Sequence, residues 1–246
     1  MKQEYKMKKI FLILFCFPMI VFGQYYEPSS SGQLVKHAYY SLSYSEENEQ
    51  AEWVYYTLNP EMLKQKVKRR DNYYLDTNIT THSASKKDYS GSTYHKGHLV
   101  PARDMLFSNH SMLQSFYMSN IAPQNSSFNK GIWLKLENRI RKWVTSEGEM
   151  HIVAGGVFSN NLGKIGLNQV TIPSYFYKIV YSEEKNKMIG FVIPNKNNSS
   201  DLKDLAFSVD SIESLTNINF FYQLDDAIEN TLESDKKFKD WLSNYN

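Results

Sequence analysis

The sequence predicts an α+β fold in which a mostly antiparallel sheet is flanked by helices. Strand-like segments and one strong helical segment are intermixed without the regular alternation that a parallel βαβ fold requires. Aromatic residues make up 15% of the chain, with 18 Tyr, which is typical of a sheet-rich globular protein. With 41% hydrophobic residues in a chain of 246, one substantial core can be buried, so we expect a single folded domain.

Residues 1–23 have the pattern of a secretory signal peptide. Lys6, Lys8 and Lys9 precede an apolar run from Ile10 to Phe22, and Gly23 stands before the expected cleavage point. The run is too short to span a bilayer comfortably, although an uncleaved membrane anchor is the alternative. We therefore expect a secreted or periplasmic protein with no stable membrane association after cleavage.

The only cysteine, Cys16, lies within that apolar run. The processed chain would then contain no thiol. This excludes a disulfide framework, a thiolate nucleophile and any zinc site built on cysteine.

Charge is distributed unevenly along the chain. The formal net charge is +2, but residues 1–23 carry four Lys against one Glu, which leaves about −1 for the rest. Residues 95–145 hold seven Lys or Arg against two acids, whereas residues 201–246 hold ten acids against four Lys. A basic centre in a chain without excess charge suggests an anionic substrate bound locally, although an ordinary mixed surface would give similar counts.

The first half of the chain is expected to contain mostly strands and loops. Residues 24–35 are predicted to form a loose leader, so the folded domain is expected to span residues 36–246. Residues 39–45 and 52–58 are rich in β-formers and predict strands. Residues 77–93 predict an exposed loop, and the short apolar run at 97–102 ends at Pro101.

The second half begins with the strongest helix, predicted over residues 126–144. Its apolar residues recur at helical spacing: Ile132, Trp133, Leu136, Ile140, Trp143 and Val144. Residues 151–158, 170–182 and 186–195 predict strands, with a polar turn between the last two. Asp210 and Glu213 are expected to cap a short helix, and the acidic tail is expected to hold one or two more.

His95 and His98 lie three residues apart, which leaves three readings open. They could bind a metal, provide a catalytic base or mark a polar turn. A His-x-x-His pair still needs further zinc ligands, and no cysteine is available. On a strand the two side chains would also point to opposite faces, which disfavours a shared zinc ion.

Asn129, Glu137 and Arg141 recur at multiples of four along the predicted helix. Each step of four turns the helix only about 40° past a full circle, so these side chains climb one side. Glu137 and Arg141 would form a favourable helix pair in any case. Beside a neutral histidine, however, the set suits phosphodiester hydrolysis, with an oxygen donor for Mg²⁺, a base, and an arginine for developing charge.

Two separated stretches, "DYSGSTYHKGHLVPARDM" and "YMSNIAPQNSSFNKGIWLKLENRIRKW", closely resemble the DNA/RNA non-specific endonuclease family. This family is a branch of the ββα-metal nuclease superfamily that includes endonuclease G. The likeness covers roughly residues 36–224. It implies a ββα-metal nuclease motif within the α+β fold.

The resemblance also implies roles for individual residues. His98 matches the general base, and Asn129 matches the single protein ligand of Mg²⁺, for which Mn²⁺ is a possible substitute. Glu137 matches the acid that orients water on the ion, and Arg141 matches the arginine that engages phosphate.

Three further residues complete the predicted site. Asn120 matches an asparagine that supports the site, and Arg70 matches an upstream substrate-binding arginine. Lys96 is expected to contact phosphate, but it stands in a departure from the family pattern. The family usually has Asp-Arg-Gly-His where this chain has His95-Lys96-Gly97-His98. Lys96 keeps the positive charge and loses the two-point grip of arginine on phosphate.

The resulting hypothesis is an exported, Mg²⁺-dependent endonuclease that hydrolyses DNA and RNA with little sequence preference. One alternative is a catalytically weakened nucleic-acid-binding homologue. Another is a metal-dependent phosphodiesterase for small nucleotides. The preference between DNA and RNA, and the oligomeric state, are left open.

Overall fold

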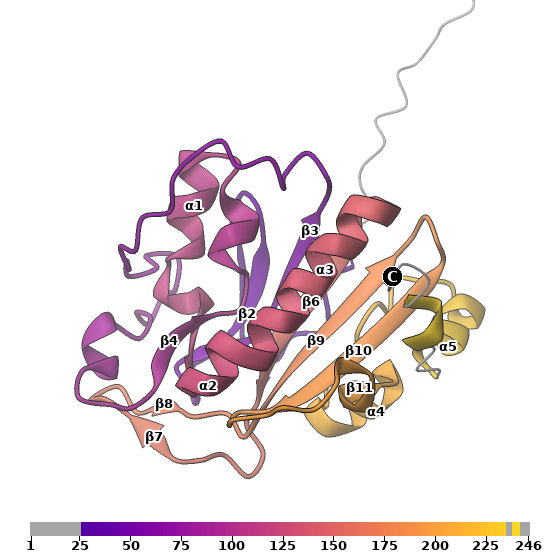
Figure 1. Cartoon of the computed structure of the whole chain (residues 1–246). Helices are drawn as coiled ribbons and strands as arrows, with labels where there is room; N and C mark the ends of the chain where they lie inside the picture. The colour runs from indigo at the N-terminus through magenta and orange to yellow at the C-terminus, as the bar shows by residue number, and fades with distance from the viewer. Residues whose placement is uncertain (1–25, 235–237, 242–246) are drawn as a thin grey trace, which may run out of the picture.

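The computed structural model describes residues 26–234 and 238–241, so the predicted signal peptide lies outside the described residues. Its centre is a seven-stranded antiparallel sheet in the order β1-β2-β3-β6-β9-β10-β11 (Figure 1). The strands are β1 Gln33–Lys36, β2 Ser41–Ser45, β3 Gln50–Leu58, β6 Met150–Val157, β9 Tyr175–Ser182, β10 Lys187–Pro194 and β11 Ala206–Phe207. The predicted antiparallel sheet is thus confirmed.

Both faces of this sheet are covered, and each face carries its own core. On β3, Val54 and Tyr56 point into the core beneath α3 (Leu134–Glu147), whereas Trp53 and Tyr55 point into the other core. This alternation follows from the two-residue period of a strand. It explains why the central strands contain almost continuous apolar runs, since neither face is open to water.

A second, two-stranded sheet stands beside the first and leads into the long helix. β4 (His95–His98) pairs antiparallel with β5 (Ile121–Gln124). The chain then enters α2 (Ser126–Phe128), a π-helical turn (Asn129–Trp133) and α3. Two strands followed by a helix form the predicted ββα motif, and α3 runs across the central sheet (Figure 1).

The remaining elements are short. They comprise α1 Asn109–Ser115, α4 Val209–Thr216, α5 Asp226–Glu233, and the small hairpin β7 Lys164–Ile165 with β8 Val170–Thr171. Single 3₁₀ turns occupy Lys86–Tyr89, Ala102–Met105, Met118–Asn120, Leu202–Leu205 and Phe238–Trp241. Of the described helices, none combines the length and apolar character needed to cross a bilayer.

The predicted loose leader is largely ordered in the described part. Tyr26 is only 1% exposed, and the Ser29 N–H donates to the Asn219 carbonyl at 2.8 Å. β1 crosses the expected boundary between leader and domain at residue 36. The Ser-rich composition concealed this, because Val35 alone among the β1 residues is buried.

The long helix is confirmed, with one irregularity. All six residues of its predicted apolar stripe are at most 3% exposed. At Gly131, φ is −103° and ψ is −106°, which is not helical, and the surrounding turn is wider than an α-helical one. Trp133 therefore points into the core against Phe128 and Phe176, while Asn129 lies on the cleft described below.

Two local predictions need correction. The segment at 170–182 is not one strand, because a break around Pro173 separates β8 from β9. The cap of α4 is Ser208, whose side chain accepts from the Ser211 N–H. Asp210 lies in the first turn instead, and a Glu213 oxygen accepts from the Phe220 N–H at 2.7 Å.

Candidate active site

A cleft of about 640 Å³ lies beside the ββα motif. Its lining comes from β4, from the π-helical turn and α3, and from neighbouring loops: Arg69, Tyr73, Tyr89, Ser92, Tyr94, His95, Lys96, His98, Pro101, Ala102, Arg103, Asn129, Lys130, Leu134, Glu137 and Arg141. Five of these residues are Lys or Arg, and one is an acid. The cleft is therefore strongly cationic, and the basic centre noted in the sequence is concentrated here.

His98 stands at the end of β4, on the wall of the cleft. Its ring makes an edge contact with Phe116, with ring centroids 4.6 Å apart, and lies 5.9 Å from the ring of Tyr73. Burial, and then the nearby charge of Arg69, lower the pKa of His98 to about 3. The imidazole is therefore neutral at neutral pH, and its buried Nε2 has no hydrogen-bond partner among the described residues.

Asn129 is half-buried at the start of the π-helical turn, and its side chain faces the same cleft. Its backbone N–H is bonded to Asn125, but its amide makes no hydrogen bond within the described part of the chain. An uncommitted amide oxygen in the same cleft as the Glu137 carboxylate suits a hard cation such as Mg²⁺, which prefers oxygen ligands. The residues present therefore fit the predicted ion.

Glu137 and Arg141 also face the cleft, but they belong to a buried group of four charges. This charge quartet consists of Asp104, Glu137, Arg141 and Lys178. Arg141 donates to Asp104 at 2.6 Å and lies 3.8 Å from the Glu137 carboxylate. Arg141 is therefore already held by carboxylates, and its side chain is 10% exposed.

The environment of the charge quartet shifts its pKa values strongly. Burial raises the pKa of Glu137 against the opposing charge of Lys178, and burial raises that of Asp104 against Arg141. Burial lowers the pKa of Lys178, whose ammonium donates to the Leu99 carbonyl at 3.3 Å. For Arg141, the two carboxylates outweigh burial and raise the pKa.

Two adjacent arginines, Arg69 and Arg70, lie where the upstream arginine is predicted. Arg69, and not Arg70, lines the cleft, where its guanidinium lies 5.5 Å from the centroid of the Phe116 ring. Its Nε also donates to Asp71 at 2.6 Å. Arg70 is exposed and does not belong to the cleft lining.

Asn120 is completely buried and lies outside the cleft lining. Its Oδ1 accepts from the Val100 N–H at 2.8 Å, and its Nδ2 donates to the carbonyls of Val100 and Ser115. The residue thus supports the segment just after His98. It positions the site and makes no contact with the cleft.

Lys96 projects between two tyrosines. Its ammonium lies 5.3 Å from the Tyr73 ring centroid and 5.7 Å from that of Tyr89, within cation–π range. His95 lines the same cleft, and burial, Lys130 and Lys96 lower its pKa. Aromatic rings therefore hold the cation at the position where the family pattern has an acid–arginine pair.

The zinc interpretation of His95 and His98 receives no support. In residues 26–234 and 238–241, the one group of three metal-ligating side chains is Asp210, Glu213 and Glu233, far along the chain.

Gly97, between the two histidines, is needed for close packing. A Cβ there would lie 2.4 Å from Cγ of Gln124 on the paired strand.

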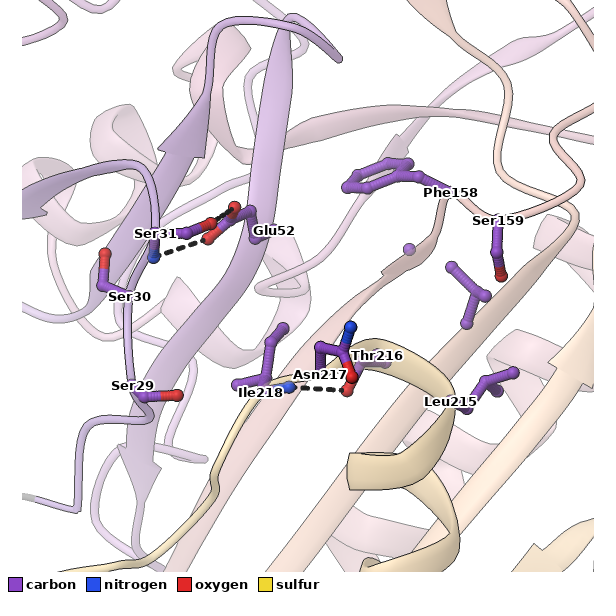
Figure 2. A pocket seen from close by; sticks show the side chains of 12 residues that line it. Ser29, Ser30, Ser31, Glu52, Phe158, Ser159, Leu215, Thr216, Asn217 and Ile218 are labelled. Atoms are coloured by element: carbon purple, nitrogen blue, oxygen red, sulfur yellow. Dashed lines mark hydrogen bonds between the residues drawn. The ribbon is translucent and has the colours of Figure 1, made fainter.

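A second cavity, of about 420 Å³, lies near the start of the described chain (Figure 2). Its lining includes Ser31, Phe158 and Asn217, and Glu52 is the one charged residue among the described residues around it. Both the hydroxyl and the N–H of Ser31 bond to Glu52. A polar cavity with only a carboxylate is unsuited to a polyanion, so the cationic cleft remains the candidate active site.

Several cleft residues were not predicted: Arg69, Tyr73, Tyr89, Arg103 and Lys130. Tyr89, Arg103 and Lys130 lie within the two stretches that resemble the family, so their closeness in sequence to His98 and Asn129 could have indicated them. Lys178 carried no such signal. A single Lys within an apolar strand is normally read as a surface residue, yet this side chain is 0% exposed.

A ββα motif whose strand-end histidine and helix asparagine share a cationic cleft defines the class of ββα-metal nucleases. A chain of the solved complex between EndoG and EndoGI has the same fold, with a TM-score of 0.73 and 25% identity over 79% of this chain and 87% of that chain. The model of the DNA/RNA non-specific endonuclease family matches residues 22–227. The chain belongs to this family.

Relatives of this chain include nucleases from several kingdoms. The mitochondrial nuclease EXOG of Xenopus laevis is 30% identical over 85% of this chain, and the match spans 63% of that protein. A nuclease of a Nostoc strain is 31% identical over 79% of this chain and 75% of its own length. Human mitochondrial endonuclease G is 30% identical over 76% of this chain and 69% of its own length.

Proposed function

We propose that this protein is an exported, Mg²⁺-dependent endonuclease that hydrolyses phosphodiester bonds of DNA and RNA with little sequence preference. The observation that carries the proposal is the shared cleft. It combines a neutral His98 with an unpartnered nitrogen, an uncommitted Asn129 amide, the Glu137 carboxylate and five cationic side chains. Membership of the non-specific endonuclease family supports the same reaction class.

His98 would accept a proton from the attacking water. Its low pKa keeps the ring unprotonated in the free protein, which a general base requires. An anionic phosphodiester in the cleft favours the imidazolium form and so raises this pKa toward the working range. Asn120 holds the backbone of Val100, two residues after His98, and so supports the segment that carries the imidazole.

Asn129 would hold Mg²⁺, or Mn²⁺ in its place, with Glu137 orienting water molecules around the ion. When bound, the ion would stabilise negative charge on the phosphate and the leaving oxygen. Arg141 cannot reach phosphate freely while Asp104 holds it at 2.6 Å, so we assign it chiefly to positioning Glu137. Lys96, Arg69, Arg103 and Lys130 are then the groups that contact phosphates along the substrate.

Low sequence preference follows from the same lining. Lysine and arginine side chains bind phosphate oxygens, which are identical at every step of a strand. Tyr94, which also lines the cleft, adds an aromatic face that tolerates any base.

The central test is His98→Ala, assayed on supercoiled plasmid and on a long RNA, with Mg²⁺ and with EDTA. Loss of a general base typically lowers the rate about 10²–10⁴-fold, while binding should persist because the cationic side chains remain. His110→Ala, which removes an exposed histidine on α1, is the matched control and should retain wild-type turnover. Wild-type turnover of His98→Ala would contradict the proposed mechanism.

The same assay separates the two alternatives. Binding of DNA without any Mg²⁺-dependent cleavage would indicate a weakened nucleic-acid-binding homologue. Cleavage confined to dinucleotides, with plasmid left intact, would indicate a phosphodiesterase for small nucleotides. Full activity in EDTA would contradict the role of Asn129.

Export rests on residues 1–23 alone, and the relatives named above include mitochondrial proteins. N-terminal sequencing of the protein from the periplasm or the culture medium tests it. Processed protein that begins near Gln24 is expected, whereas intact protein retained in the cytoplasm would contradict export.

A further inference from the structure

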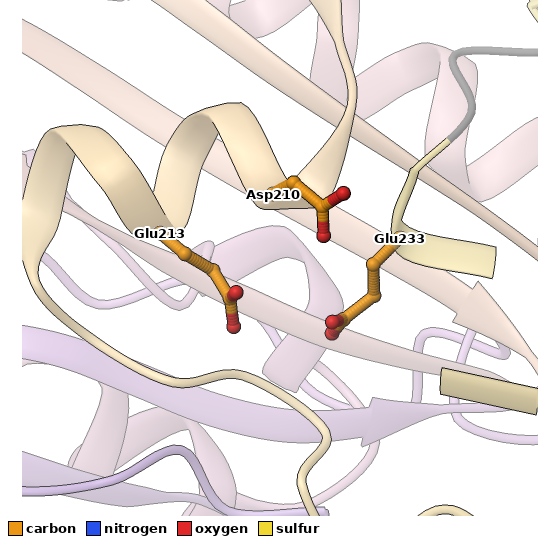
Figure 3. A group of neighbouring side chains, drawn as sticks. All are labelled: Asp210, Glu213 and Glu233. Atoms are coloured by element: carbon orange, nitrogen blue, oxygen red, sulfur yellow. The ribbon is translucent and has the colours of Figure 1, made fainter. Parts of the chain in front are cut away.

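Three carboxylates converge at the end of the molecule where α4 meets α5. Asp210 and Glu213 come from α4, and Glu233 is the last residue of α5 (Figure 3). Their ligand oxygens all lie within 4.8 Å of one another. Figure 3 shows the three carboxylates turned toward a common point.

Glu233 is the residue that distinguishes this cluster from an ordinary acidic surface. It is only 3% exposed, and its buried Oε1 has no hydrogen-bond partner among the described residues. A buried carboxylate without a partner is unfavourable by several kcal/mol when it is ionised. Something beyond the described chain must therefore compensate it, or it must hold a proton.

No cation from the described residues compensates the cluster. None of the ion pairs within residues 26–234 and 238–241 involves Asp210, Glu213 or Glu233. The further charge acting on the cluster is the Glu229 carboxylate, which is also negative. Burial, and then Glu213, Glu229 and Asp210, raise the pKa of Glu233 to about 9.

We propose that Asp210, Glu213 and Glu233 bind a Ca²⁺ ion that joins α4 to α5. Three carboxylates without nitrogen or sulfur donors form a site for a hard cation. Ca²⁺–oxygen distances of about 2.3–2.6 Å let one ion contact oxygens up to about 5 Å apart, whereas Mg²⁺ at about 2.0–2.1 Å requires a tighter arrangement. The three oxygens, all within 4.8 Å of one another, lie within the reach of one Ca²⁺ ion.

The Glu213 carboxylate is already fixed for this role. One of its oxygens accepts from the Phe220 N–H at 2.7 Å, which holds the carboxylate over the segment between the two helices. Asp210 is exposed, so water can complete the coordination of the ion from outside. Because the Glu213 carboxylate is already held, the entropic cost of binding is lowered.

This site is separate from the cleft. Ile212 and Leu232, beside the cluster, pack on the face of the sheet opposite α3. Glu233 also lies beyond residue 227, where the family match ends. The inference thus stands independently of the proposed nuclease function.

Equilibrium dialysis of the full chain against ⁴⁵Ca²⁺ tests the proposal, with Asn129→Ala as background so that the cleft cannot contribute. We expect one Ca²⁺ per chain with a Kd on the order of 10⁻⁴–10⁻³ M, the range of extracellular sites. Glu233→Gln and Asp210→Asn should each weaken binding at least about tenfold. Asp204→Asn, an exposed acid outside the cluster, is the control and should leave the Kd unchanged.

Thermal unfolding of the same variants gives a second measurement. Ca²⁺ should raise the Tm of the parent and much less that of Glu233→Gln. Without Ca²⁺, Glu233→Gln should instead have the higher Tm, because glutamine needs no proton uptake on folding, whereas the buried glutamate does. If Glu233→Gln does not fold, the exposed Asp210→Asn decides. Absence of Ca²⁺ binding at about 10 mM, roughly tenfold above the Kd of the weakest such sites, would overturn the proposal. Equal binding by both variants and the parent would also overturn it.

Discussion

Each face of the sheet carries a pair of enclosed carboxyl groups, but the two pairs have different partners. The α3 face has Asp104 and Glu137, and the opposite face has Glu213 and Glu233. On the α3 face, Arg141 and Lys178 balance the two acids. On the other face, Glu213 and Glu233 meet further carboxylates. Burial raises the pKa in both regions, but only the charge quartet contains cations that oppose the rise. The difference shows that partners, more than depth, decide whether a buried acid can remain ionised.

The largest expected effect comes from removing a cation of the charge quartet. Arg141→Met should lower the free energy of unfolding by about 3–5 kcal/mol, because Asp104 is left buried without its partner. Urea unfolding measures the loss. The matched control is Lys142→Met, which removes an exposed cation from the same helix and should change stability by less than about 0.5 kcal/mol.

A double variant sharpens this result. Asp104→Asn combined with Arg141→Met removes both charges and should be more stable than Arg141→Met alone, since no unpaired charge remains. Equal losses in Arg141→Met and Lys142→Met would show that the charge quartet is not what stabilises this face.

On the opposite face of the sheet, replacing a buried ionisable group should raise the free energy of unfolding and not lower it. In the folded chain, burial and the neighbouring carboxylates raise the pKa of Glu233 from 4.5 to about 9. The folded chain therefore binds more protons between these values, and without divalent cations its stability should fall as pH rises through this window. Glu233→Gln should reduce that fall and stabilise the chain at pH 8 by about 1–3 kcal/mol.

Urea unfolding in EDTA at pH 5, 7 and 9 checks this expectation. Glu61→Gln serves as the control, because it changes an exposed glutamate that lies outside the cluster. A pH profile that is the same in wild type and Glu233→Gln would mean that Glu233 ionises normally.

The smallest effect is expected for Asp210→Asn in EDTA. Asp210 is exposed and acts on Glu233 more weakly than burial, Glu213 or Glu229 do. Removing its charge should stabilise the chain by less than about 0.5 kcal/mol, and Asp204→Asn should have no such effect. If Asp210→Asn stabilised the chain as much as Glu233→Gln does, the exposed Asp210 would be the main source of repulsion in the cluster, and the buried Glu233 would not.

Sequence reasoning succeeded where the structure depends on local pattern. The apolar stripe from Ile132 to Val144 predicted α3, and its period placed Glu137 and Arg141 on one side. His98 and Asn129 were predicted to belong to one site from the two family stretches, and the structure places both on one cleft.

Prediction from sequence failed where the position of a side chain depends on long-range packing. Arg69 and Arg70 are adjacent in a loop without regular structure, so no period indicates which of them faces the cleft. Lys178 meets Glu137 only because β9 passes beneath α3, and neither residue carries a sign of the other in sequence. The acid cluster likewise needs α5 to fold back beside α4, which the acidic composition of the tail does not predict.

The π-helical turn at Gly131 determines how the residues before it are rotated about the helix axis relative to the residues of α3. One residue more or less rotates everything on one side of it by about 100° relative to the other. Asn129 and Glu137 are eight residues apart, which in a regular α-helix would separate their directions by about 80°. The wide turn takes up one residue, so both side chains face the same cleft while α3 stays packed on the sheet. The packing of α3 thus determines the orientation of Glu137 and Arg141, and the wide turn determines that of Asn129 relative to them. Because Phe128, next to Asn129, packs against Trp133 and Phe176 in the core, a change in the turn would move catalytic and core side chains together.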